Sequence, residues 1–172
     1  CGYPYKELCG AGVAWNVIRV LYENYDMDKR EAEDLLDFVA MATVCDVMSL
    51  TGENRILVKE GLKRIRHTKN IGLQALMQAC NVQPENISAY HFGYVLGPCV
   101  NATGRLDTAR HALRLFETGQ ETEAEEIARD LVDLNQERKE LTLQGVEMAK
   151  KLCEEGGYEN DPVLVLFLPD VH

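Results

Sequence analysis

The sequence has no apolar run long enough to cross a bilayer. Its longest, residues 163–168, is the length of a strand, whereas a membrane span needs about 20 apolar residues. The first residues also lack the charged, apolar and small-residue order of a secretory signal peptide. We therefore expect a cytoplasmic protein with no membrane partner. Because the chain starts at Cys1 rather than at Met, we also expect a piece of a longer protein.

Residue patterns typical of disulfide frameworks, zinc sites and nucleophilic triads are missing. None of the six cysteines forms a C-x-x-C pair, and the four histidines show no ligand spacing to one another. No Ser/His/Asp or Cys/His triad can be assembled from this order of residues. Low-complexity segments are missing too. A composition of 46% hydrophobic and 27% charged residues is ordinary for a globular domain.

The net charge of −10 is unevenly distributed. Residues 117–161 hold 14 acidic and 5 basic side chains, whereas the rest of the chain holds 14 and 13. Segment 55–69 is basic, with six Lys or Arg and a single Glu. Whole-chain acidity therefore does not exclude a nucleic-acid partner.

Apolar spacing predicts a mainly α fold, with helices over about 10–22, 28–47, 51–67, 72–80, 106–116 and 120–153. The last of these has a narrow apolar seam and an acidic exterior, typical of a helix that connects two bodies or packs on one side only. The run 163–168 predicts a buried strand that has no obvious partner strand, which indicates truncation.

Asp46 is the first candidate for chemistry, because apolar residues flank it on both sides. Burying a carboxylate is costly unless it is paired, hydrogen-bonded or bound to a metal. Spacing alone leaves open a metal or catalytic role, a helix cap and a core salt bridge. Asp37 has similar neighbours, but nine residues at about 100° each place it on the opposite helix face.

The segment 97–104 predicts a glycine-rich loop that ends in Arg105 at a helix start. Free backbone N–H groups and a guanidinium suit a phosphate. The alternative is a plain loop in which Asn101 or Thr103 caps the next helix, and both side chains are able to do either.

The helix 51–67 carries a basic stripe beside its buried stripe. At about 100° per residue the basic stripe spans about 80° and comprises Arg55, Lys59, Lys63 and Arg66. It is either a solvated face or a surface that follows phosphates. Tyr90, Phe92 and Tyr94 fit base stacking and core positions equally well.

Four runs together resemble the RecJ-type single-strand-specific exonucleases of the DHH phosphoesterase family. They are LCGAGVAW (8–15), LDFVAMATVCDVMSLTGENRILVKEGLKRIR (36–66), LGPCVNATGRLDTA (96–109) and LNQERKE (134–140). The pairing of the second run with the third is specific to RecJ-like members. The resemblance covers nearly the whole chain, in family order.

The resemblance implies a hydrolase that removes nucleotides from the 5′ end of single-stranded DNA in recombination and repair. It implies two divalent ions, Mn²⁺ or Mg²⁺, with Asp46 as a metal ligand and catalytic residue. It also implies phosphate contacts, with single-stranded DNA as the substrate and a single-strand-binding protein or a helicase as further partners. The residues expected to contact phosphate are Asn101, Gly104 and Arg105 of the glycine-rich segment, together with Lys59, Lys63 and Arg66 of the basic stripe. Many relatives have Arg at the position of Cys99, so one phosphate contact is absent here or supplied elsewhere.

The same resemblance divides the chain. Residues 1–116 resemble the helical C-terminal part of the DHH-type α/β domain, 117–157 the connector helix, and 158–172 the start of the DHH-associated domain. The family's D-x-D run and Asp-His-His triplet are absent from this sequence. We therefore expect the isolated chain to be inactive and to bind no metal.

Two other interpretations remain. One is a non-catalytic helical module that holds single-stranded DNA or a repair partner through the basic stripe. The other is a DHH phosphoesterase that acts on short oligonucleotides or small phosphodiesters.

Overall fold

The computed structural model describes residues 2–106, 109–158 and 163–168, with the backbone alone for 103–106. Its regular structure is helical, and these ranges contain no β-strand. The prediction of a mainly α fold is confirmed. The predicted strand at 163–168 is wrong: the segment runs without a ladder partner, and Val165 and Phe167 are more than four-fifths exposed. A strand exists only where another strand satisfies its N–H and C=O groups.

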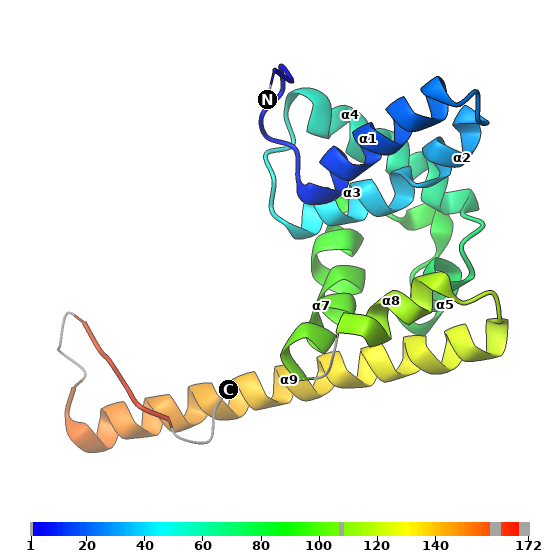
Figure 1. Cartoon of the computed structure of the whole chain (residues 1–172). Helices are drawn as coiled ribbons and strands as arrows, with labels where there is room; N and C mark the ends of the chain where they lie inside the picture. The colour runs from blue at the N-terminus through cyan, green and yellow to red at the C-terminus, as the bar shows by residue number, and fades with distance from the viewer. Residues whose placement is uncertain (1, 107–108, 159–162, 169–172) are drawn as a thin grey trace.

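The first four helices form the N-terminal body (Figure 1). They are α1 (Gly10–Asn24), α2 (Lys29–Asp34), α3 (Leu36–Cys45) and α4 (Gly52–Arg64). The single helix predicted over 28–47 is interrupted at Leu35 and ends at Cys45. Trp15 fixes α1 across α2, because its indole N–H donates to the carbonyl of Ala32 at 2.7 Å.

Helices α3 and α4 cross with their backbones in contact. A Cβ at Gly61 would lie 2.3 Å from the Ala40 Cβ and 2.4 Å from the Leu36 carbonyl oxygen. Val58 and Ile65 on the same stripe are buried, as their spacing predicts. Only a residue without a side chain allows this approach.

A column of short elements follows α4. They are the 3₁₀ turn η1 (Ile65–His67), α5 (Ile71–Ala79), the 3₁₀ turn η2 (Pro84–Asn86), α6 (Ala89–His91), the π turn η3 (Phe92–Leu96) and α7 (Gly97–Leu106). Phe92 and Leu96 are fully buried in the main hydrophobic core, together with Leu73, Leu76 and Leu115.

The glycine-rich segment is helical, so the prediction of a loop over 97–104 is wrong. Proline inside a helix removes one N–H donor, and its ring clashes with the carbonyl four residues earlier. The π turn that ends at Leu96 precedes Pro98 and contains Tyr94, the residue whose carbonyl the Pro98 ring would meet in a regular α-helix. Gly97 is explained by packing, since a Cβ there would lie 2.3 Å from the Cys45 Sγ.

The chain continues with α8 (Ala109–Glu117) and the 36-residue α9 (Glu121–Gly156). The first half of α9 packs on α5, α7 and α8, and its second half extends beyond the body (Figure 1). The predicted seam is buried at Ala124, Ile127 and Leu131, whereas Met148 and Leu152 are each 41% exposed. Gly157 ends the helix in the left-handed conformation, with φ 69°.

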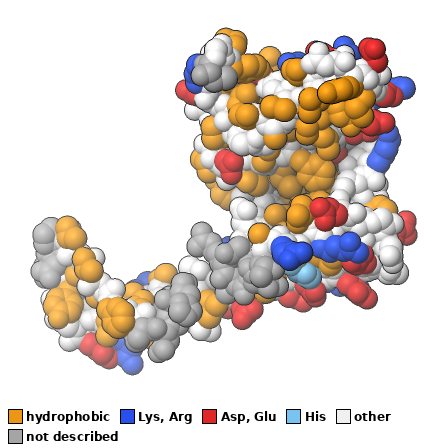
Figure 2. Space-filling model, in the orientation of Figure 1, with side chains coloured by type: hydrophobic (Ala, Val, Ile, Leu, Met, Phe, Trp, Pro, Cys, Tyr) orange, Lys and Arg blue, Asp and Glu red, His pale blue; other side chains and the backbone are white. Residues whose placement is uncertain are grey.

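Apolar side chains also remain exposed on the outer face of α1. Figure 2 shows hydrophobic side chains gathered over this helix and along the outlying part of α9. On α1 the exposed residues are Val13, Val17, Val20 and Leu21. No helix in the described ranges has the length and apolar character needed to cross a membrane.

Candidate functional site

Asp46 lies at the point where α3 ends. Its backbone N–H donates to the Ala42 carbonyl at 2.9 Å, and Val47 then adopts a φ of 54°, which turns the chain away from the helix. Both side chains are exposed, Val47 to 88%. The interpretation that apolar neighbours enclose Asp46 is therefore wrong, because helical periodicity no longer applies after Cys45. Asp46 forms no ion pair within the described ranges, which leaves its carboxylate accessible to a cation.

The thiol before Asp46 is engaged inside the protein. Cys45 donates to the carbonyl of Phe92 at 3.4 Å. Burial, with a smaller contribution from the Asp46 charge, raises the pKa of the Cys45 thiol to about 11. With this pKa, Cys45 is neutral at neutral pH beside the exposed carboxylate. A cation binds the thiolate rather than the thiol, so Cys45 is a poorer ligand than Asp46.

A buried amide holds the loop that follows Asp46. The Asn54 side chain is fully buried, and its Nδ2 donates to the carbonyls of Ser49 at 3.1 Å and Glu7 at 2.7 Å. These bonds tie the loop 47–51 to the N-terminal segment. Sequence reasoning missed Asn54, although it lies four residues before Val58 on the buried stripe of α4 and its polar character there was a usable signal.

The N-terminal end of α7 lies against the C-terminal end of α3, through the contact of Gly97 with Cys45. Asn101 is exposed on α7. Gly104 and Arg105 belong to the last turn of α7, and their side chains lie outside the described residues. The prediction that Arg105 stands at a helix start is wrong. A helix C-terminus presents carbonyl groups rather than free N–H groups, so a phosphate contact here depends on the guanidinium alone and stays a prediction.

The predicted basic stripe is exposed on α4 and the η1 turn, and we call it the basic face. It consists of Arg55, Lys59, Lys63 and Arg66. Lys63 pairs with Glu60 at 2.7 Å, whereas the other three form no ion pair with any described residue. Arg64 points the other way and pairs with Glu33 and Asp34. At least three cations of the basic face are therefore free to meet an external anion.

The described residues do not by themselves form a two-metal centre. Within the described ranges, no three His, Cys, Asp or Glu side chains converge on a site that could hold a metal ion. Mg²⁺ and Mn²⁺ prefer several oxygen ligands, and Asp46 supplies one carboxylate. The described part of the chain therefore does not by itself fit the pair of cations that the resemblance implies.

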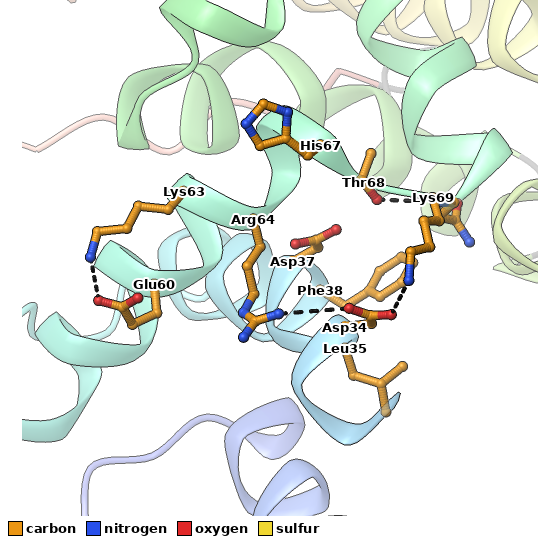
Figure 3. A pocket seen from close by; sticks show the side chains of 11 residues that line it. Asp34, Leu35, Asp37, Phe38, Glu60, Lys63, Arg64, His67, Thr68 and Lys69 are labelled. Atoms are coloured by element: carbon orange, nitrogen blue, oxygen red, sulfur yellow. Dashed lines mark hydrogen bonds and ion pairs between the residues drawn. The ribbon is translucent and has the colours of Figure 1, made fainter. Parts of the chain in front are cut away.

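Asp37 lines a separate pocket of about 630 Å³ at the other end of α3 (Figure 3). Its side chain is buried, and Oδ1 has no hydrogen-bond partner in the described structure. Burial raises the pKa of the Asp37 carboxyl, and a hydrogen bond with Thr68 offsets this only in part. Beside it, Asp34 accepts from Lys69 at 3.1 Å and pairs with Arg64 at 3.6 Å. Sequence reasoning placed Asp37 away from Asp46, and Asp46 does not line this pocket.

The buried Asp37 predicts a pH dependence of stability. A carboxyl whose pKa is raised by folding binds more protons in the folded than in the unfolded state, so the free energy of unfolding falls as pH rises from about 4 through the folded-state pKa. Asp37→Asn removes this titration, and we expect a flatter stability profile over that window. Urea unfolding across the pH range measures it. Equal slopes for both proteins would contradict the burial of an ionisable Asp37.

Cys99 is buried in α7 and is not a substitute for a surface cation. Its Sγ lies 3.8 Å from the Sγ of Cys80 and 3.5 Å from the Asn135 Nδ2. The position faces the packing between α7 and α9, where the thiol donates to the Val95 carbonyl. A phosphate contact is therefore absent at this position.

No protein-family model matches the chain. Curated relatives named single-stranded-DNA-specific exonuclease RecJ do match. The protein from Haemophilus influenzae is 35% identical over 184 residues, which cover 100% of this chain and 32% of the relative. The protein from Bacillus subtilis is 32% identical over 165 residues, which cover 96% of this chain and 20% of the relative. The chain thus spans between a fifth and a third of the length of these relatives.

Solved structures of RecJ exonucleases share the fold of this chain. RecJ from Thermus thermophilus in complex with Mn²⁺ superposes with a TM-score of 0.81 at 33% identity, over 97% of this chain and 24% of that one. A second structure, exonuclease RecJ bound to manganese, superposes with a TM-score of 0.77 at 34% identity. The superposition covers 90% of this chain and 38% of that one. The resemblance that the four sequence runs carry is confirmed, in sequence and in fold.

Proposed function

From the similarity of the chain to RecJ along its whole length, we propose that it is the helical segment of a metal-dependent exodeoxyribonuclease. The activity proposed is 5′–3′ hydrolysis of single-stranded DNA in recombination and repair. The observation that carries the proposal is the joint match of sequence and fold, which extends over α3, α4, α7 and α9 together. Fold alone would not carry a function.

Each candidate residue has a physical role in this proposal. Asp46 is exposed at the end of α3 and is suited to give one carboxylate to a metal centre completed by residues from outside this segment. Asn101, Gly104 and Arg105 belong to α7, whose first residue packs against Cys45, the residue before Asp46. A bound divalent cation would stabilise charge on the phosphate. We expect the isolated chain to have no nuclease activity, because Asp46 alone does not organise two cations.

The packing of α9 supports the proposed division of the chain. Residues 1–116 would belong to the DHH-type domain, 117–157 to a connector, and 158–172 to the next domain. The first half of α9 is buried against α5, α7 and α8, and the apolar seam of its second half is exposed. This is the pattern expected of a helix whose far end meets another domain.

The basic face gives a prediction for binding. Replacing Lys59, Lys63 and Arg66 with Ala removes up to three phosphate contacts. We expect weaker binding to single-stranded DNA and a slope of log K against log salt that is shallower by about 2, since each contact with a single strand contributes about 0.7. A salt titration with a fluorescent oligonucleotide measures this. The matched control is the replacement of Arg129, Lys150 and Lys151 on α9, and an unchanged slope in the basic-face variant would remove that face from the site.

A second candidate is a non-catalytic module that holds single-stranded DNA. The observation that favours it is the exposed basic face, which could bind phosphates without any metal. The two candidates differ at Asp46, which is needed for hydrolysis but not for binding.

A further inference from the structure

Two aromatic side chains outside the proposed site are exposed and stacked on one another. Tyr90 is 63% and Tyr94 73% exposed, although Phe92 between them is fully buried. Their ring centroids are 5.2 Å apart, with an interplanar angle of 26°. Neither hydroxyl has a hydrogen-bond partner in the described ranges. The structure therefore separates three aromatics that the sequence left equivalent: one is core and two face solvent.

The backbone that carries this pair packs against the end of α3. Phe92 accepts the hydrogen bond from the Cys45 thiol, and a Cβ at Gly93 would touch Val44 at 3.4 Å. Ser88 and His91 form a capping box that fixes the start of α6, on which Tyr90 lies. The tyrosines are thus anchored to the helix end that carries Asp46, and Tyr94 itself lies in the π turn η3. Turns of this kind are frequent at functional sites.

We propose that Tyr90 and Tyr94 form a stacking surface for an unpaired nucleobase of single-stranded DNA. The inference rests on the proposed function and deepens it. Every nucleobase offers a π face, so such a surface binds without sequence preference. The bases of a duplex are already stacked on their neighbours, so the surface would favour single strands. In a chain with net charge −10, it supplies binding that does not depend on opposite charge.

The test compares oligonucleotides with and without bases. Fluorescence anisotropy is measured for the 172-residue chain with a labelled oligothymidylate and with an abasic oligonucleotide of the same length. Loss of base stacking typically weakens binding about tenfold per base. We expect the unaltered chain to prefer the oligothymidylate about tenfold. The Tyr90→Leu/Tyr94→Leu variant should lose this preference, with its abasic binding unchanged.

Two variants serve as controls. Tyr94→Phe keeps the ring and should keep the preference. Tyr25→Leu removes a tyrosine that is 75% exposed at the end of α1 and should change neither affinity. Circular dichroism verifies that every variant is folded.

The outcomes separate the stacking surface from the proposed function. Equal binding of both oligonucleotides by the unaltered chain, or a preference that survives the double Leu variant, overturns the stacking surface and leaves phosphate binding intact. An equal loss of both affinities in the double variant also overturns it, because the effect is then not on base stacking. Binding of neither oligonucleotide counts against the stacking surface and against DNA contact by this segment.

Discussion

Asp46→Asn in the complete protein that contains this chain is expected to lower exonuclease turnover at least about 100-fold. The amide keeps the size of the side chain but removes the anionic oxygen that a divalent cation prefers. A metal ligand stabilises the transition state by several kcal/mol, and each 1.4 kcal/mol is about tenfold in rate. Because Asp46 is exposed and forms no ion pair in the described ranges, its loss should leave the free energy of unfolding unchanged within about 0.5 kcal/mol.

The measurement is the release of nucleotides from 5′-phosphorylated single-stranded DNA with Mn²⁺, alongside thermal unfolding of the same preparations. Asp133→Asn is the matched control, because Asp133 is an exposed aspartate on α9. Full activity of Asp46→Asn would favour the non-catalytic module. A parallel loss of activity and stability would show instead that Asp46 has a structural role.

Gly61→Ala is expected to destabilise the fold by about 2 kcal/mol, despite the helical preference for alanine, which is worth up to about 1 kcal/mol. The new Cβ would lie 2.4 Å from the Leu36 carbonyl oxygen and 2.3 Å from the Ala40 Cβ, so α3 and α4 must separate. At this chain length we expect the melting temperature to fall by about 6 °C. Thermal and urea unfolding of the 172-residue chain measure the change.

Gly119→Ala is the control, because in the described structure no atom outside its two chain neighbours lies within 4 Å of its added Cβ. The double variant Gly61→Ala/Ala40→Gly should recover part of the loss, since it relieves the contact with Ala40 but not the one with the Leu36 carbonyl. A stable Gly61→Ala protein would mean that α3 and α4 do not cross as closely as the structure shows.

The local sequence pattern was sufficient to predict most of the helices. The stripe through Val58 and Ile65 and the end of α9 at Gly157 follow from periodicity and from a glycine that adopts the left-handed conformation. Helix α4 also starts after Thr51, although the Thr51 side chain makes no cap hydrogen bond. Local pattern failed at 97–106, where Gly97 and Pro98 indicated a loop. A helix forms there because the π turn before Pro98 and the contact of Gly97 with Cys45 compensate for both residues.

The candidate site divides in the same way. The sequence by itself singled out Asp46, the residues of α7 and the basic face as candidates. Local composition and helical spacing raised all three, and family resemblance gave the first two their proposed roles. Only the tertiary structure decided that Asp46 is exposed and that Asp37 is buried without a partner for Oδ1. It also decided that Tyr90 and Tyr94 face solvent. Exposure depends on which elements meet across the fold, whereas periodicity reports only which side chains share a face.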